Sequence, residues 1–208
     1  MSQPSSTHAL PKVTHLIFDM DGLLLDTERI YTQVSEKILE PHGCKFTWEV
    51  KAKMMGRTTK DTIRVLLEET GAPLTEQEYF EQSNAMQVGT SSRKEIFDVK
   101  TSQNQPLFQH FNSITCGDDP NVKLGKPHPD IFIEACRRLG NPSPEQCLVF
   151  EDSLLGVEAA KRAGMHVVWI PDSNILKLGH PDDHGACEIL NSMEEFDPAK
   201  YGLPGFEA

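Results

Sequence analysis

The segment Leu16 to Gly22 constrains the fold most, because a short apolar run ends there in two carboxylates and a glycine. Three apolar residues in a row are typical of a strand that is buried on both faces. Side chains alternate along a strand, so Asp19 and Asp21 are expected to point the same way, about 6.6 Å apart. Gly22 allows the chain to turn out of the strand at once. We therefore expect a carboxylate pair at the carboxyl end of a buried strand, where open α/β sheets place their chemistry.

The composition is that of an ordinary globular protein, with 38% hydrophobic and 25% charged residues in a chain of 208. A net charge of −11 argues against a nucleic-acid partner, because lysines and arginines dominate binding to such polyanions. One small phosphorylated substrate stays compatible with this charge, since a local pocket can reverse the overall sign.

Cysteine usage and hydropathy indicate the compartment. The five cysteines are scattered and form no C-x-x-C pair, which favours reduced thiols over a disulfide framework or a zinc site. Residues 1–12 form a polar tail without the apolar segment of a signal peptide. No apolar run approaches the length of a membrane span. We expect a cytoplasmic protein that does not contact membranes.

Two kinds of pattern divide the chain. Residues 28–85 show helical spacing and no strand signal, so we expect a helical module inserted after the first strand. Strands and helices alternate afterwards, which predicts βαβ units and a doubly wound parallel α/β core built from residues 13–27 and 86–208. The expected later strands are Met86–Thr90, Ser113–Cys116, Cys147–Phe150, His166–Ile170 and Ala186–Leu190.

Several residues predict where helices begin. Thr59 is a candidate N-cap, and a proline at residue 129 suits a helix start. Capping boxes are expected at Thr75–Glu78 and Ser92–Glu95.

A second carboxylate pair, Glu151 and Asp152, follows the apolar strand at residues 147–150. Taken alone, Asp152 or Ser153 would be interpreted as a helix cap. Two buried strands that both end in carboxylates favour a shared hard cation instead, and oxygen ligands suit magnesium. An EF-hand is excluded, because Leu24 stands where that loop needs glycine and Ile30 where it needs glutamate.

Hydroxyl groups and a lysine also stand at the end of a predicted strand or before a predicted helix. Thr90 and Ser91 end a candidate strand and open a helix, which suits an anion site as well as a simple N-cap. Lys126 precedes a predicted helix, in a segment that is no Walker loop because Pro120 replaces the first glycine. Carboxylates, a hydroxyl and a lysine at one sheet edge are the groups that phosphoryl transfer uses. One Asp can then be the nucleophile and the other the general acid/base.

This ordered set resembles the haloacid dehalogenase superfamily of phosphatases, through Phe18–Gly22, Thr90, Lys126 and Glu151-Asp152. The resemblance implies that Asp19 is the nucleophile and Asp21 the general acid/base. It also implies that the phosphoryl group binds to a set of three residues, Thr90, Ser91 and Lys126.

The same resemblance implies a Mg²⁺ cofactor. Its expected ligands are Asp19, the backbone carbonyl of Asp21, and Asp152, with Glu151 in support.

Within the superfamily, the closer resemblance is to the pseudouridine-5′-phosphatase group. That similarity is carried by Val13–Glu28, Met54–Arg57, Gly117–Pro120, Leu148–Ser153 and Tyr201–Pro204. It implies hydrolysis of pseudouridine 5′-phosphate or a related nucleotide or sugar phosphate. It also implies that residues 28–85 form a helical cap that selects the substrate, with Gly56 and Arg57 facing the pocket.

The chain departs from the family pattern in one place. The helix that begins at Thr75 runs almost directly into Met86 and Thr90, so about 30 residues are missing, roughly one helix-plus-strand unit. Gln82–Asn84 is the expected junction. Two alternatives stay open: a phosphomutase that uses the same Asp pair, and a shortened variant that serves as a non-enzymatic binding partner. We expect a monomer.

Overall fold

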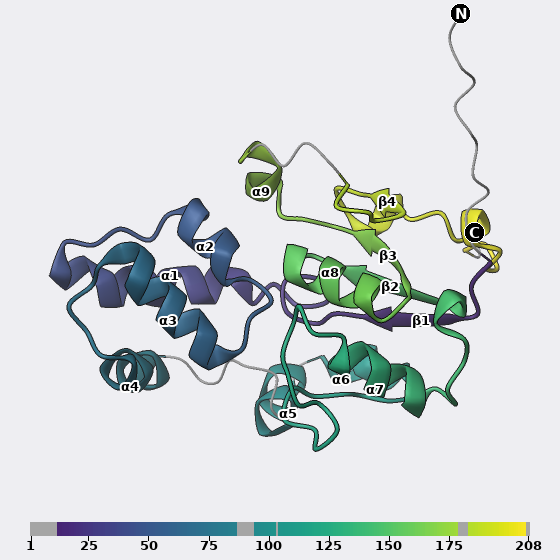
Figure 1. The fold of residues 1–208 in the computed structure, drawn as a ribbon, viewed down its shortest axis with the longest axis horizontal. Helices are drawn as coiled ribbons and strands as arrows, with labels where there is room; N and C mark the ends of the chain where they lie inside the picture. The colour runs from purple at the N-terminus through teal and green to yellow at the C-terminus, as the bar shows by residue number, and fades with distance from the viewer. Residues whose placement is uncertain (1–11, 87–93, 103, 179–182, 207–208) are drawn as a thin grey trace, which may run out of the picture.

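A parallel sheet of four strands, ordered β1-β2-β3-β4, lies at the centre of the computed structural model (Figure 1). The structure describes residues 12–86, 94–102, 104–178 and 183–206. All five residues of β2 are buried, as a continuous apolar run in a central parallel strand requires. The expected doubly wound parallel fold class is confirmed. The strands are β1 (His15–Phe18), β2 (Cys147–Glu151), β3 (His166–Trp169) and β4 (Glu188–Ile189).

Apolar clusters cover both faces of this sheet. Helices α7 (Asp130–Arg138) and α8 (Leu154–Arg162) pack on one face, where Phe132, Val149 and Val157 are buried. The opposite face is covered by the C-terminal 3-10 turns, η3 (Met193–Glu195) and η4 (Pro198–Tyr201), around Phe196 and Tyr201. The η2 turn (Pro144–Gln146) leads directly into β2. With both faces covered, the strand ends are the part of the sheet that a site can use.

Helices α1 to α4 form a group of their own beside the sheet (Figure 1). Their cluster includes Val34, Ile38, Leu39, Ile63 and Leu66, which are all buried. Between residues 28 and 86 every described regular element is helical, and the assignment of residues 28–85 as an inserted module stays a prediction. Its role as a substrate-selecting cap stays a prediction. The elements are α1 (Glu28–Leu39), η1 (Glu40–His42), α2 (Trp48–Met54), α3 (Thr59–Thr70) and α4 (Glu76–Met86).

Local capping explains where these helices begin. The capping box at the start of α4 is confirmed: the Glu78 amide donates to the Thr75 hydroxyl, and the Glu78 carboxylate accepts from the Thr75 amide. The expected cap of α3 is wrong by one residue. Thr58 is the N-cap, because its hydroxyl accepts from the Asp61 amide, and Thr59 is the first helical residue.

Aromatic rings attach α5 (Lys94–Thr101) and α6 (Gln105–Phe108) to the edge of the sheet. Ring centroids lie 5.3 Å apart for Phe97 and Phe108, 5.9 Å for Phe108 and Phe111, and 5.6 Å for Phe111 and Phe18. This chain of contacts ends at the last residue of β1, so α5 is held beside the turn that carries Asp19 and Asp21. The last helix, α9 (Ser173–Lys177), follows β3 and contacts α2.

Two strand predictions need correction. Ser113–Cys116 is not a strand: its segment forms no ladder with the described residues, and the Ile114 carbonyl instead accepts from the Arg138 guanidinium. Met86 was predicted to open a strand but is the last residue of α4, while residues 87–90, together with Ser92 and Arg93, lie outside the described residues. None of the described helices is long and apolar enough to cross a membrane.

Candidate functional site

Strand β1 brings Asp19 beside the end of β2. The Asp19 amide donates to the Phe150 carbonyl at 3.0 Å, which continues the ladder one residue past β1. The Asp19 carboxylate accepts from the Lys126 ammonium at 2.5 Å, and the same ammonium also binds the Glu151 carboxylate. The side chains of Asp19, Lys126 and Glu151 are 18%, 11% and 0% exposed. A lysine before α7 therefore joins the largely buried Asp19 and the fully buried Glu151 at the carboxyl ends of neighbouring strands.

Burial sets the electrostatics of this cluster. It raises the pKa of Asp19 to about 7; Lys126 opposes this rise, and the Glu151 charge adds to it. Burial also disfavours the charge on Lys126, but Asp19 and Glu151 outweigh it and raise the pKa of the ammonium above its ordinary value. Lys126 therefore keeps its positive charge, next to a carboxyl group whose pKa lies well above its ordinary value.

The Glu151 carboxylate is held by the loop that opens α8. It accepts from the Ser153 amide at 2.9 Å and from the Ser153 hydroxyl at 3.0 Å. The Ser153 hydroxyl in turn accepts from the Gly156 amide, so Ser153 caps α8. A Cβ on Gly156 would lie 1.9 Å from the Glu151 carboxylate, so the first turn of α8 has room for this side chain only because residue 156 is glycine.

Asp152 completes a group of three carboxylates. Ligand oxygens of Asp19, Glu151 and Asp152 all lie within 4.8 Å of one another, and Asp152 is 5% exposed. The Asp152 backbone carbonyl accepts from the Trp169 indole at 2.9 Å, which fixes the chain at this point. Gathering three carboxylates in a buried place is costly without compensating positive charge. Hard oxygen donors of this kind fit Mg²⁺, so the residues present suit the expected cofactor.

Asp21 lies outside that group, in contacts of its own. Its Oδ1 atom accepts from the Thr27 hydroxyl at 2.8 Å and from the Lys100 ammonium at 2.5 Å. The chain has left the strand by then, because β1 ends at Phe18. The two carboxylates therefore bind two different lysines, and the expected use of the Asp21 backbone carbonyl as a metal ligand stays a prediction.

Lys100 is not among the site residues predicted from the sequence. It comes from α5, three residues after Phe97 and so on the same side of the helix. Its ammonium also lies 3.1 Å from the Tyr31 hydroxyl of α1, and its side chain is 6% exposed. The sequence offered a weak signal, a lysine next to the apolar side of a short helix. Its partner lies 79 positions earlier in the chain.

Of the remaining predicted site residues, the structure describes Gly56 and Arg57 but not Thr90 and Ser91. A Cβ on Gly56 would lie 2.6 Å from the Ser153 hydroxyl, so the loop after α2 packs directly on the loop after β2. The Arg57 Nε atom donates to the Lys53 carbonyl of α2 at 2.6 Å, and its contact with a substrate stays a prediction. Thr90 and Ser91 lie outside the described residues.

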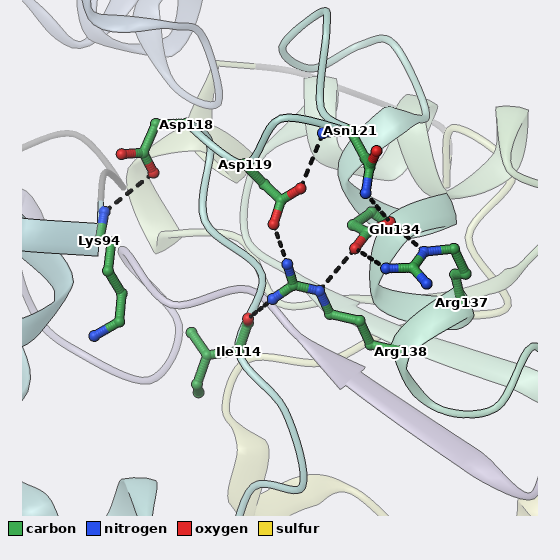
Figure 2. A network of polar contacts seen from close by, with 8 residues as sticks. All are labelled: Lys94, Ile114, Asp118, Asp119, Asn121, Glu134, Arg137 and Arg138. Carbon is green, nitrogen blue, oxygen red and sulfur yellow. Dashed lines mark hydrogen bonds and ion pairs between the residues drawn. The ribbon is translucent and has the colours of Figure 1, made fainter.

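A polar network beside the site was also missed (Figure 2). Glu134, which is 3% exposed, accepts from Arg137, Arg138 and Asn121. Arg138 reaches on to Asp119. The neighbouring Asp118 carboxylate accepts from the Lys94 amide at 3.1 Å, at the start of α5. The Gly117–Pro120 segment thus ties α7 to α5 through Asp119 and Asp118. These two links join residues 19 and 24 positions apart, which sequence spacing does not reveal.

Comparison with known sequences gives a consistent result. Two family models, both described as haloacid dehalogenase-like hydrolase, match residues 16–86 and 81–164. A Drosophila melanogaster protein named probable pseudouridine-5′-phosphatase is 40% identical, over 95% of this chain and 97% of its own. An Arabidopsis thaliana protein named (DL)-glycerol-3-phosphatase 2 is 40% identical, over 100% and 99%.

A solved structure agrees with these sequence matches. CbbY from Rhodobacter sphaeroides, in complex with phosphate, is 25% identical with a TM-score of 0.63 and covers 92% of this chain and 100% of its own.

The alignments also measure the expected shortening. The Drosophila alignment spans 227 positions, and 95% of this 208-residue chain fills about 198 of them. About 29 positions of that relative therefore have no counterpart here. This length agrees with the missing helix-plus-strand unit, and the two family models overlap at residues 81–86, which include the expected junction.

Proposed function

The chain belongs to the haloacid dehalogenase-like hydrolase family as a phosphoric monoester hydrolase, and on that premise we propose a magnesium-dependent phosphatase that works through an aspartyl-phosphate on Asp19. One observation carries the proposal. Asp19, Lys126, Glu151 and Asp152 converge at the carboxyl ends of β1 and β2, with three carboxylates and a fixed lysine in mutual reach. This is the edge where open α/β sheets bind ligands.

In the first step, an Asp19 carboxylate oxygen attacks phosphorus and the bond from phosphorus to the ester oxygen breaks. The protonated Asp21 carboxyl gives its proton to that departing oxygen, so an alcohol leaves and an aspartyl-phosphate remains. In the second step, water attacks the phosphorus and its proton returns to the Asp21 carboxylate. The bond from phosphorus to Asp19 breaks, which releases inorganic phosphate and regenerates both carboxyl groups.

The other residues act by charge and position. Lys126 neutralises negative charge on the phosphoryl oxygens, and its contact with Asp19 places it beside the attacking atom. Glu151 holds Lys126 in that place, while Ser153 holds Glu151. Asp19, Asp152 and Glu151 are the residues that would hold Mg²⁺. When bound, the cation supplies positive charge that stabilises the phosphoryl group and lowers the repulsion between the carboxylates.

The substrate class follows from chemistry that the relatives share. The names of the two relatives refer to a nucleoside 5′-phosphate and to glycerol 3-phosphate. In both compounds the phosphoryl group is esterified to a primary alcohol on a small polar molecule. We therefore assign this chain a small primary-alkyl phosphomonoester, with pseudouridine 5′-phosphate as the first compound to assay. Helices α1 to α4 are the part of the chain that would select among such esters, as Gly56 packs on Ser153 beside the site.

Phosphate release tests the proposal. Wild-type protein is incubated with pseudouridine 5′-phosphate and glycerol 3-phosphate, with Mg²⁺ or with a chelator. We expect release that needs Mg²⁺ and that Asp19→Asn abolishes, because an amide oxygen is a poor nucleophile. Lys53→Met is the matched control, since Lys53 is an exposed lysine that pairs with Glu69. Turnover that survives Asp19→Asn contradicts the mechanism, and full turnover in chelator contradicts the metal requirement.

A further inference from the structure

Lys100 is a buried charge to which the reaction sequence above gives no role. Its side chain is 6% exposed, and its ammonium lies 2.5 Å from the Asp21 Oδ1 atom and 3.1 Å from the Tyr31 hydroxyl. A buried ammonium is unfavourable unless strong partners compensate it. A charge-assisted hydrogen bond to a carboxylate is such a partner, and it is directional.

Three separate parts of the chain meet at this ammonium. Lys100 is on α5, Asp21 is in the turn after β1, and Tyr31 is on α1. Helix α5 is fixed at its start, where the Asp118 carboxylate accepts from the Lys94 amide (Figure 2). The Phe97 ring, on the same side of α5 as Lys100, is fixed against Phe108. The ammonium is thus delivered to Asp21 by a helix that is anchored elsewhere.

The contact falls on the carboxylate that has to move a proton. Oδ1 of Asp21 accepts from both Lys100 and Thr27, so two donors from different elements hold one oxygen. Rotation of the carboxylate would break both hydrogen bonds. A proton donor must keep a narrow orientation toward the departing oxygen, and this pair of donors restricts it.

We propose that Lys100 is a positioning residue, which holds the Asp21 carboxyl group in the orientation needed for proton transfer to the departing alcohol. The inference rests on the proposed function, and it deepens that function by naming the group that acts on the acid. Tyr31 orients the ammonium from the side of α1.

Leaving-group dependence separates this role from simple support of the fold. A primary alcohol departs only with a proton, whereas p-nitrophenolate departs without one, so poor orientation of Asp21 harms only the first kind of ester. We measure single-turnover cleavage of glycerol 3-phosphate and the rapid first release of p-nitrophenolate from p-nitrophenyl phosphate. For Lys100→Met we expect the alkyl cleavage rate to fall about 10- to 100-fold, which is part of the roughly 100- to 10,000-fold that general acid catalysis contributes. The nitrophenolate burst should change less than about 3-fold.

Lys94→Met is the matched control, because Lys94 is on the same helix, 63% exposed, and paired through its side chain with Asp98. It should leave both rates unchanged. If Lys100→Met does not fold, Tyr31→Phe is used in its place. We then expect a smaller fall in the cleavage rate, again only for the alkyl ester. If the cleavage rates of both esters fall equally, or neither rate falls, the positioning role of Lys100 is overturned. The proposed function still stands in that case, provided that the wild type is active. A wild type that cleaves neither ester overturns both.

Discussion

Gly156→Ala is a small change with a large expected effect. The new Cβ would lie 1.9 Å from Cδ and Oε1 of Glu151 and 2.3 Å from its Oε2, far inside van der Waals contact. Glu151 is fully buried and bound to Ser153 and Lys126, so it has no open direction in which to retreat. Overpacking costs about 1–3 kcal/mol. A displaced hydrogen bond to a buried charged group adds about 1.5–3 kcal/mol.

Helix propensity acts in the opposite direction. Alanine inside a helix is about 1 kcal/mol more favourable than glycine, and Gly156 lies within α8. The net expectation is a loss of about 3 kcal/mol, or a drop in Tm of about 6–12 °C for a chain of this size. Phosphate release should fall as well, because the displaced Glu151 no longer holds Lys126 beside Asp19.

Thermal unfolding followed by circular dichroism measures this change. The control is Gly205→Ala, where a Cβ would meet nothing within 4 Å, and its effect should stay within about 0.5 kcal/mol. A double-mutant cycle with Glu151→Ala locates the cause, since Gly156→Ala should cost much less when the clashing side chain is gone. A Gly156→Ala protein as stable as the wild type, or more stable, would show that the close contact with Glu151 does not exist.

Three further substitutions test other parts of the structure. Lys126→Met leaves the Glu151 charge without its lysine, so urea unfolding should show a loss of about 3–5 kcal/mol. Tyr79→Phe removes the buried hydrogen bond between Tyr79 and Ser35, and should cost about 1–3 kcal/mol in the same assay. Hydrogen bonds from Arg137 and Arg138 lower the pKa of Glu134 from 4.5 to about 2, so its ionised form stabilises the fold above pH 4.5 and less as the pH falls toward 2. Glu134→Gln should therefore lower Tm at pH 7, and the difference from wild type should shrink below pH 4; a constant difference would contradict this origin.

The central strands and their polar ends could be predicted from the sequence because both signals are local. An apolar run such as Cys147–Phe150 indicates a buried strand, and the carboxylates directly after it indicate the sheet edge. Since the carboxyl ends of parallel strands share one edge, the approach of Asp19 to Glu151 followed from topology. Lys126 joins these two carboxylates from the segment before α7. Capping at Ser153 was equally local, as its hydroxyl binds an amide three residues later.

Other features depend on contacts that spacing does not encode. Ser113–Cys116 has the composition of a strand, but a strand also needs a neighbour, and here Arg138 binds the Ile114 carbonyl. Lys100 and Asp118 are ordinary exposed residue types by sequence. Only the packing of α5 against Phe108 brings Lys100 to Asp21 and the Lys94 amide to Asp118. The short helices α6 and α9 carry too few residues for a periodic signal.

Trapping the phosphoenzyme tests the central claim most directly. Asp21→Asn slows hydrolysis of the intermediate but spares its formation from p-nitrophenyl phosphate, whose leaving group needs no proton. After an acid quench in the presence of Mg²⁺, peptide mapping by mass spectrometry should find one hydroxylamine-labile phosphoryl group on Asp19, and none when Asp19 is replaced by Asn. Two results would contradict the assignment of Asp19 as the nucleophile. One is a phosphoryl group on any other residue. The other is an unmodified Asp19 in the quenched Asp21→Asn protein although the wild type turns the substrate over.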